Sequence, residues 1–281
     1  MNFKYGAFAD ESNDKFEGQI DALKRSGYDY LEIRNLNGKN FTELTLSEAK
    51  EIDKQLRDNG LSIISLGSPI GKIDINGDFE KHLDLYKHTL EIGKVFGAEK
   101  IRLFRFFMPK DENPEIYKNL VIERMGKFAE IAKEYGILAC HENEKGIYGD
   151  IASRCLDIHK AVPEIKGVFD PANFVQCGQD TLEAWEILNP YIDYMHIKDA
   201  LADGRVVPPG QGKGNVEELL KKYSAIGGEL LTLEPHLYDF VGLKNLEREG
   251  EESVVGAMSF ETSEKAFDFA VNNLKIMVEK I

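Results

Sequence analysis

The chain has 281 residues, of which 42% are hydrophobic and 10% aromatic, and its 35 Lys and Arg against 49 Asp and Glu give a formal net charge of −14. There is enough apolar material for a substantial core, which excludes a disordered chain, and the acidic balance argues against a nucleic-acid partner. No stretch reaches the roughly 18 uncharged apolar residues of a membrane span, and the first eleven residues show no secretion signal, so we expect neither a membrane partner nor export.

The cysteines are Cys140, Cys155 and Cys177, an odd number without metal-finger spacing. Neither a disulfide framework nor a zinc knuckle can be built from them. We therefore expect a cytoplasmic protein.

Short β-rich runs alternate with longer segments of helical period from the beginning of the chain, the pattern of βα units around a parallel sheet. Strands are predicted at 3–9, 28–33, 62–66, 100–105, 137–142, 167–170, 191–197 and 229–234. Helices are predicted at 15–25, 46–59 after Thr45, 79–96 before Gly97, 115–135 before Gly136, 151–161, 182–188, 216–226 and 263–279. Eight pairs of about 35 residues each predict an α/β protein with one (β/α)8 TIM barrel over residues 1–281.

A doubly wound sheet is the alternative architecture. It would be favoured by a glycine-rich phosphate turn after the first strand, but Ala-Asp-Glu-Ser stands there at 9–12. The segment 208–214, PPGQGKG, lacks the ending of a phosphate loop and is read as a turn. The one long insert is about 236–259, after the last strand; it carries the charged run 247–252, and such loops are usually lids or oligomer contacts.

The last residues of four successive predicted strands are acidic or histidine. In a barrel these strand ends point toward one mouth, where catalytic groups gather. The residues are Glu142, Asp170, His196 and Glu234. Three carboxylates in one mouth would repel each other unless a cation compensated them, so a divalent metal is predicted, with Mn²⁺, Mg²⁺, Co²⁺ and Zn²⁺ all compatible with oxygen ligands and one imidazole.

Five motifs make the chain resemble the xylose isomerase-like TIM-barrel superfamily, in particular its sugar phosphate isomerase/epimerase branch. They are HENEKGIYGD at 141–150, FDPANF at 169–174, HIKD at 196–199, PGQG at 209–212 and LEPH at 233–236. The resemblance implies one ion, Mn²⁺ as the first choice, held by Glu142, Asp170, His196 and Glu234. It also implies that Glu142 and Glu234 exchange a proton with the substrate through an enediolate.

Two departures lie on the substrate side of that site. Ketose epimerases have a His directly after the Glu-Asn pair of the fifth strand, where this chain has Glu144, and a second His where it has Asn173. These changes put the particular epimerase reaction in doubt and leave the metal ligands intact.

Further residues at the predicted mouth are candidates for substrate binding. They are Glu32, Glu144, Asn173, Lys198, Arg205 and His236. Three of them have a structural alternative: Lys198 could pair with Glu144 or Asp199, and Arg205 could be a solvated loop charge. Glu32 could form an ion pair with Arg34, at the end of the same strand, or with Arg105, at the end of the fourth strand. His141, which alternates with Glu142, is expected to pack away from the site.

The function expected from these residues is a metal-dependent isomerase or epimerase of a ketose- or sugar-like substrate, with a small-molecule carbohydrate as partner. A lyase of the inosose dehydratase type is the enzymatic alternative, because the same enediolate can expel a β-hydroxyl. A non-catalytic sugar-binding barrel is the alternative outside catalysis. A homo-oligomer is compatible with the fold and the exposed insert.

Overall fold

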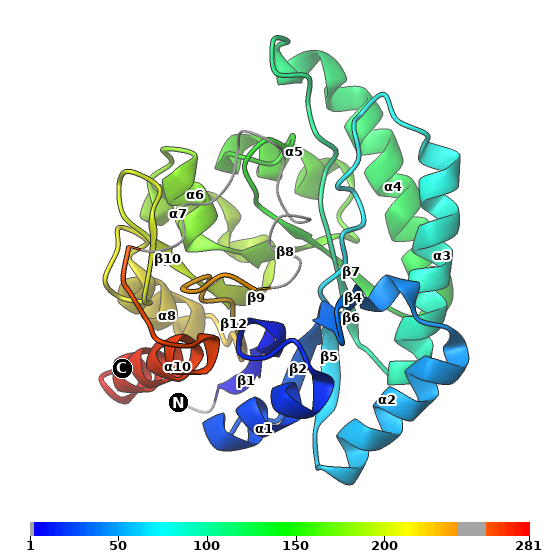
Figure 1. Ribbon diagram of the computed structural model, residues 1–281. Helices are drawn as coiled ribbons and strands as arrows, with labels where there is room; N and C mark the ends of the chain where they lie inside the picture. The colour runs from blue at the N-terminus through cyan, green and yellow to red at the C-terminus, as the bar shows by residue number, and fades with distance from the viewer. Residues whose placement is uncertain (1–2, 241–256) are drawn as a thin grey trace.

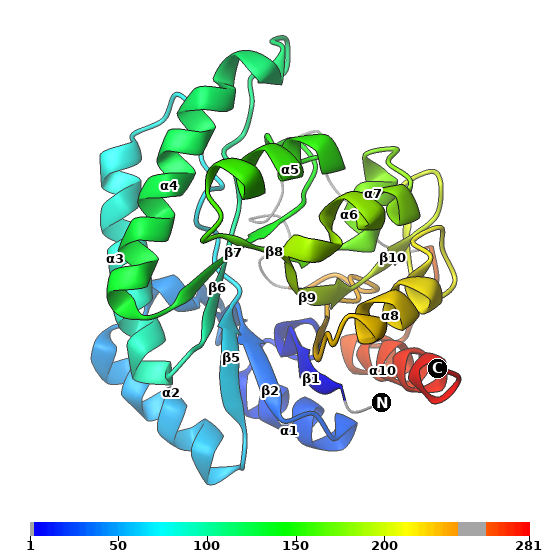
Figure 2. The ribbon, with the colours of Figure 1, turned by 180° about the vertical axis from the view of Figure 1, so that it is seen from behind.

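The computed structural model describes residues 3–240 and 257–281 as eight parallel strands closed into a barrel, surrounded by helices (Figures 1 and 2). Around the barrel the strand order is β1-β12-β9-β8-β7-β6-β5-β2, so neighbours in sequence are neighbours in space and the first strand pairs with the last. The bounds are β1 (Lys4–Ala7), β2 (Tyr30–Ile33), β5 (Ser62–Leu66), β6 (Lys100–Leu103), β7 (Leu138–Glu142), β8 (Lys166–Phe169), β9 (Ile192–Ile197) and β12 (Leu230–Leu233). The predicted (β/α)8 barrel is confirmed.

One long helix follows each barrel strand. They are α1 (Phe16–Ser26), α2 (Leu46–Asp58), α3 (Phe79–Phe96), α4 (Lys118–Tyr135), α5 (Ala152–Ala161), α7 (Thr181–Leu188), α8 (Val216–Ala225) and α10 (Ser263–Glu279). Thr45 begins α2 with a capping box, and Gly97 and Gly136 end α3 and α4 in the left-handed conformation, as their positions predicted.

Three small elements were not predicted, and all follow strands at the barrel mouth. A hairpin of β3 (Asn35–Leu36) and β4 (Lys39–Asn40) follows β2, and one of β10 (Asp199–Ala200) and β11 (Val206–Val207) follows β9. The six-residue helix α6 (Pro171–Gln176) follows β8. Two-residue strands and a single helical turn carry too little periodicity to be read from sequence.

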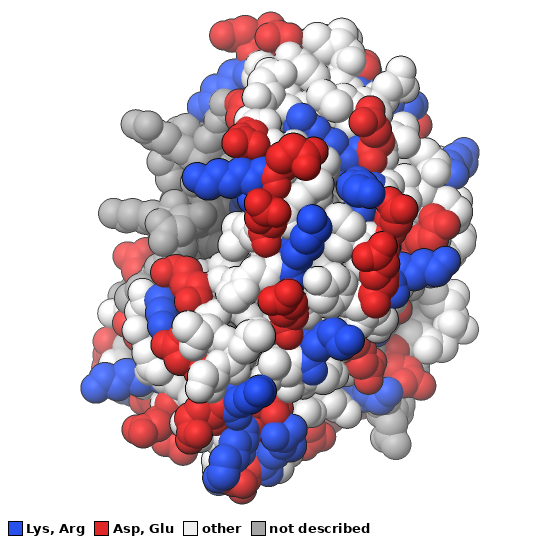
Figure 3. Space-filling model, turned by 90° about the vertical axis from the view of Figure 1, so that its right-hand side faces the viewer, with Lys and Arg blue, Asp and Glu red and all other residues white. Residues whose placement is uncertain are grey.

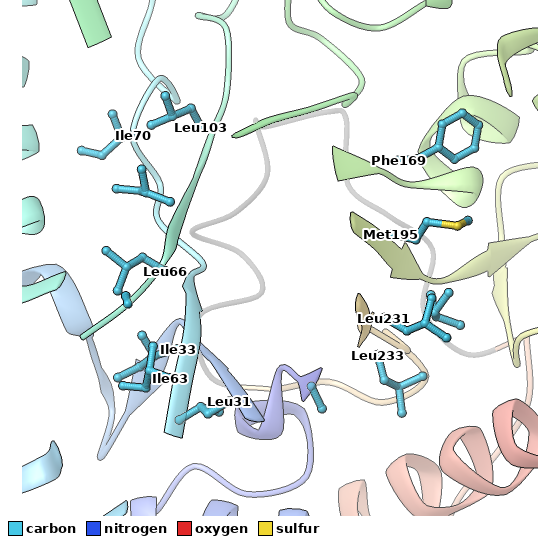
Figure 4. Close-up of a cluster of buried hydrophobic side chains, with 14 of the residues drawn as sticks. Leu31, Ile33, Ile63, Leu66, Ile70, Leu103, Phe169, Met195, Leu231 and Leu233 are labelled. Atoms are coloured by element: carbon cyan, nitrogen blue, oxygen red, sulfur yellow. The ribbon is translucent and has the colours of Figure 1, made fainter. Parts of the chain in front are cut away.

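The main core lies between the strands and the helices. Leu31, Ile33, Leu103 and Phe169 belong to this cluster, and Figure 4 shows such side chains on the outer side of the sheet. A second, smaller cluster is formed by Ile64, Cys140, Val168, Tyr194 and Leu230. Because strand residues alternate between the two faces, a polar residue between two core residues, such as Glu32, points into the barrel.

The face formed by α2, α3 and α4 carries acidic and basic side chains intermixed (Figure 3). Pairs such as Lys54–Asp58 and Lys127–Glu130 lie within single helices. No basic stripe of the kind that binds nucleic acid runs over that face. Within the described residues, no helix has both the length and the apolar character needed to cross a bilayer.

Most of the predicted insert at 236–259 lies outside the described residues, including the charged run at 247–252. A role as a lid or an oligomer contact therefore stays a prediction.

Candidate metal centre

Four consecutive strands of the sheet deliver the predicted metal ligands to one place. Glu142 ends β7, Asp170 directly follows β8, His196 lies near the end of β9, and Glu234 directly follows β12. One potential ligand atom from each lies within 4.8 Å of all the others, and all four residues are buried. Ligands on opposite sides of an ion with bonds of about 2.1 Å are about 4.2 Å apart, so a small contraction would bring all four into contact with one ion.

The two nitrogens of His196 face different groups. Nδ1 lies 2.9 Å from Oε1 of Glu142 and 3.3 Å from Oε2 of Glu234, so it points into the quartet. Nε2 lies 3.2 Å from Oε2 of Glu32. Burial opposes protonation of the ring, but Glu142 and Glu32 outweigh it and raise the pKa of His196 well above its usual value. In the metal-free protein the ring therefore keeps a proton on Nδ1, at the position where an ion would bind.

Glu32 does not lie where a substrate-binding residue was expected. It is fully buried behind the His196 ring, and its Oε1 accepts hydrogen bonds from the Tyr194 hydroxyl at 2.9 Å and the Ser65 hydroxyl at 3.1 Å. Its position between two core residues of β2 turns it into the barrel, beneath the quartet. The expectation of substrate contact is corrected: Glu32 orients His196.

Asp170 carries the observation that best fits a bound cation. Its Oδ1 accepts the Asn173 amide at 2.9 Å and so begins α6, while its buried Oδ2 faces the ammonium group of Lys198 at 2.9 Å. Burial, reinforced by Glu142 and Glu234 against the opposing effect of Lys198, raises the pKa of Asp170 to about 7. A buried carboxylate beside two other carboxylates is costly, and a divalent cation would compensate their charge.

Lys198 is placed between two of the predicted ligands. Its Nζ lies 2.9 Å from Oδ2 of Asp170 and 3.4 Å from Oε2 of Glu234. Burial opposes its charge, but these carboxylates outweigh burial and raise the pKa of Lys198 well above its usual value. Pairing with Glu144 or Asp199 had been the alternative to substrate contact, and the structure instead shows pairing with the ligands themselves.

Two buried arginines complete the centre. Nη1 of Arg102 lies 3.2 Å from Oε2 of Glu142, and Nη1 of Arg34 lies 2.9 Å from Oε1 of Glu234. Arg34 had been noted as a strand-end residue, but Arg102 was missed. The signal was present: Arg102 stands between Ile101 and Leu103 on a buried strand, so it must point into the barrel.

A second group of possible ligands lies beside the first and consists of Glu11, Glu234 and His236. Arg34 already binds this group, with Nη2 3.0 Å from Oε1 of Glu11 in addition to its contact with Glu234. Its guanidinium supplies the positive charge that another cation would bring, so the site fits one ion better than two.

His236, a predicted substrate-binding residue, would share the direction of Glu234 if the backbone between them stayed extended. The backbone does not: His236 has φ 46°, in the left-handed region. Its ring nevertheless returns to the same place, with Nε2 3.3 Å from Oε1 of Glu11 and 3.5 Å from Oε1 of Glu234.

The remaining expected residues divide between the centre and the surface. Asn173 reaches the centre, with Nδ2 3.4 Å from Oε1 of Glu142. Glu144 is nearby and pairs with Lys72 at 3.4 Å. Arg205 does not reach it: its side chain is 47% exposed and paired with Asp203 at 2.9 Å in the loop between β10 and β11. That hairpin, which was not predicted, is the reason.

His141 and Arg105 both lie away from the centre, as was expected for His141. His141 packs against Arg105, on the side of β7 opposite to Glu142. Arg105, which had been noted as a strand-end residue, therefore points away from the quartet.

The glycine-rich segment 208–214 does not present its amides to a ligand. The carboxylate of Asp199 accepts hydrogen bonds from the backbone N–H groups of Gly210, Gly212 and Gly214 at 2.8–3.0 Å. The segment is a structural turn, and the protein's own carboxylate occupies the position of an anion.

The comparisons with known proteins agree with this geometry. A family model described as xylose isomerase-like TIM barrel matches residues 20–254. Among curated proteins, no relative matches the chain in sequence.

Several solved structures share the fold. The IolI protein with a bound zinc atom has a TM-score of 0.75 at 17% identity, over 99% of this chain and 98% of that one. The D-psicose 3-epimerase from Clostridium cellulolyticum H10 with D-tagatose has a TM-score of 0.73 at 14% identity, over 98% and 99%. A probable 3-DHS dehydratase, AsbF from Bacillus anthracis, has a TM-score of 0.72 at 16% identity, over 99% of both chains.

Proposed function

The chain belongs to the xylose isomerase-like TIM barrel family, and from this premise we propose that it is a divalent-metal-dependent isomerase or epimerase of a ketose- or sugar-like molecule. The observation that carries the proposal is the convergence of four buried ligand groups within 4.8 Å. Three of these groups are buried carboxylates, whose mutual repulsion a divalent cation would compensate.

The residues that hold the ion in this proposal are Glu142, Asp170, His196 and Glu234. An ion bound there would act as a Lewis acid, which would polarise a substrate carbonyl and acidify the adjacent C–H. Mn²⁺ suits oxygen-rich ligation with one imidazole, and zinc in the similar IolI structure makes Zn²⁺ the first alternative to test.

Glu142 and Glu234 are the proposed bases. The strands β7 and β12 that carry them are separated in the sheet by β8 and β9, which carry the other two ligands. The two glutamates thus approach the centre from either side, as two-base proton exchange requires. Lys198 lies 3.4 Å from Oε2 of Glu234, and Arg102 lies 3.2 Å from Oε2 of Glu142. Burial of Glu234 is outweighed by Lys198 and His236, which keep the pKa of Glu234 well below its usual value.

The proton taken from carbon leaves an enediolate, and its return to the other carbon or the other face gives the isomer or epimer. Lys198 and Asn173 are the proposed donors to substrate oxygens, since both lie beside the carboxylates that would hold the ion. Glu144 and His236 lie at the edge of the same group and are proposed substrate contacts as well.

A lyase is the second candidate, because the dehydratase AsbF shares the fold and the protonated Lys198 could give a proton to a leaving hydroxyl. One experiment separates the candidates. The purified protein with Mn²⁺ is incubated with a panel of keto-sugars in D₂O, with a chelated sample as control. Metal-dependent deuterium uptake at the carbon beside the carbonyl, without loss of water, supports the isomerase.

The other outcomes of this experiment contradict the proposal. A new enone absorbance assigns the lyase. Sugar binding that survives chelation, without exchange or elimination, assigns a non-catalytic binding barrel.

A further inference from the structure

Aromatic rings and cations alternate along one side of the candidate metal centre. In order, the series consists of Phe240, Arg34, Phe8, Arg102, Phe104 and Lys72. Cζ of Arg34 lies 4.5 Å and 4.4 Å from the ring centroids of Phe240 and Phe8. Cζ of Arg102 lies 5.1 Å and 4.7 Å from those of Phe8 and Phe104. Each arginine therefore lies over two rings, at distances where a cation is attracted to a π face.

Each cation of this series forms an ion pair with a carboxylate at or beside the centre. Arg34 and Arg102 contact Oε1 of Glu234 and Oε2 of Glu142, and Nζ of Lys72 lies 3.4 Å from Oε2 of Glu144. In each of the two glutamates, Glu234 and Glu142, one carboxylate oxygen pairs with an arginine. The other oxygen, Oε2 of Glu234 and Oε1 of Glu142, faces Nδ1 of His196. The arginines thus select which oxygen of each glutamate points inward.

Hydrogen bonds fix Arg34 more firmly than Arg102. Asp10 binds Arg34 through a fork of two bonds, at 2.9 and 3.0 Å. In contrast, Nε of Arg102 has no hydrogen-bond partner among the described residues, and its bond to the Ser68 carbonyl is long at 3.4 Å. Apart from its ion pair with Glu142, the orientation of Arg102 therefore depends mainly on the two rings that it covers.

Two glycines, Gly67 and Gly71, leave the space that Phe8 and Phe104 occupy. A Cβ atom on Gly67 would lie 2.4 Å from Cε1 of Phe8 and 3.0 Å from the Ile33 carbonyl oxygen, so only glycine leaves room for the Phe8 ring. Gly71 has φ 93°, and a Cβ there would lie 2.1 Å from the Phe104 carbonyl oxygen. The ring of Phe8 also meets His196 edge-on, with centroids 5.3 Å apart.

We propose that Phe8 and Phe104 are positioning residues of the metal centre: their rings hold Arg34 and Arg102 so that one oxygen of Glu234 and one of Glu142 face the ion. Phe8 acts on both arginines and Phe104 on Arg102 and Lys72. The inference rests on the proposed function in assuming that this centre binds a divalent ion.

Binding of Mn²⁺ to the full chain, measured by titration calorimetry, tests the inference without any substrate. Loss of an outer partner of a metal ligand typically weakens affinity 10–100-fold. We expect the Mn²⁺ dissociation constant to rise by about this factor in Phe8→Leu and by less in Phe104→Leu. Gly67→Ala, which displaces the Phe8 ring while leaving every member of the series in the sequence, should act like Phe8→Leu.

Phe128→Leu is the matched control, since Phe128 is equally buried but packs among Phe79, Tyr86 and Phe106. It should lower thermal stability as Phe8→Leu does and leave the Mn²⁺ affinity unchanged. Folded Phe8→Leu and Gly67→Ala proteins that bind Mn²⁺ as tightly as the wild type would overturn the inference.

Crystal structures of the metal-free wild type and Phe8→Leu keep the two proposals separable. We expect the variant to lose the Arg34–Glu234 and Arg102–Glu142 pairs, while unchanged pairs would overturn the positioning role. A wild type that binds no divalent ion contradicts the proposed function, and in that case the metal-free structures still decide whether the rings position the glutamates.

Discussion

Nε2 of His196 lies 3.2 Å from a carboxylate oxygen of Glu32, on the side of the ring opposite to the proposed ligands Glu142 and Glu234. This contact keeps a proton on Nε2, so that the proton on Nδ1 is the one that leaves when an ion binds.

Glu32→Gln tests this relationship. A glutamine can turn its amide N–H₂ toward Nε2, which would place the ring proton on Nδ1 and block the ligand atom. We expect the Mn²⁺ affinity to fall about 10–100-fold. The change is nearly isosteric and keeps an acceptor for Tyr194 and Ser65, so the fold should survive.

Asp53→Asn on α2 is the control for removing a buried carboxylate far from the centre. It should leave the affinity at the wild-type value. If Glu32→Gln binds Mn²⁺ like the wild type, Glu32 does not set the tautomer of His196.

Replacement of either proposed base should lower turnover strongly at every metal concentration. Glu142→Gln and Glu234→Gln each remove a positioned base, which is worth roughly 10²–10⁴ in rate. The measurement is deuterium exchange into the substrate at saturating Mn²⁺. Asp170→Asn removes a ligand but no base, so its exchange rate should recover as Mn²⁺ is raised. Recovery of either glutamate variant under the same conditions would show that the glutamate serves as a ligand alone.

The affinity for the metal should rise with pH, because the metal-free centre holds protons where the ion binds. The pKa of Asp170 is raised to about 7 and that of His196 well above its usual value, so binding must release these protons. Each released proton makes the dissociation constant change about tenfold per pH unit below the pKa of its group. The slope should therefore decrease above about pH 7, where Asp170 is already ionised.

Titration calorimetry in two buffers of different ionisation enthalpy counts the released protons directly. We expect more protons released at pH 6 than at pH 8. Equal release at both values, or none, would mean that Asp170 is a free carboxylate in the metal-free protein.

The sequence was sufficient for the barrel and for the four predicted ligands. Strong alternation of strand and helix patterns predicted the barrel, and the strand ends then brought Glu142, Asp170, His196 and Glu234 together without any knowledge of side-chain contacts. This prediction succeeds because barrel closure directs the C-terminal end of every strand to one mouth. A residue at a strand end is therefore placed at the mouth by its position in the sequence.

The arginines could not be placed in the same way. Arg34 and Glu234 are 200 residues apart, and they meet only because β12 closes the barrel next to β1, beside β2. No local pattern records such a contact. Arg205 shows the converse error, since its place in sequence suggested the mouth, but the short β10–β11 hairpin turns it to the surface.

Replacement of Asp199 should destabilise the fold, because its carboxylate occupies the position of an anion in the glycine turn at 208–214. It accepts the Ala200 amide at 2.9 Å besides those of Gly210, Gly212 and Gly214. In Asp199→Asn the charge is lost and an amide N–H₂ replaces one acceptor, so buried backbone donors lose their partners. We expect a loss of about 2–4 kcal/mol in the free energy of unfolding.

This loss corresponds to a fall of roughly 5–10 °C in the thermal midpoint, which calorimetry would measure. Asp203→Asn, in the exposed loop of the same β10–β11 hairpin, is the matched control and should leave the midpoint nearly unchanged. Inorganic phosphate should not raise the midpoint of the wild type, because Asp199 already occupies the amides that phosphate would bind. A wild-type midpoint that rises with phosphate would show that the turn binds anions after all, and the glycine segment would then have to be considered as part of the substrate site.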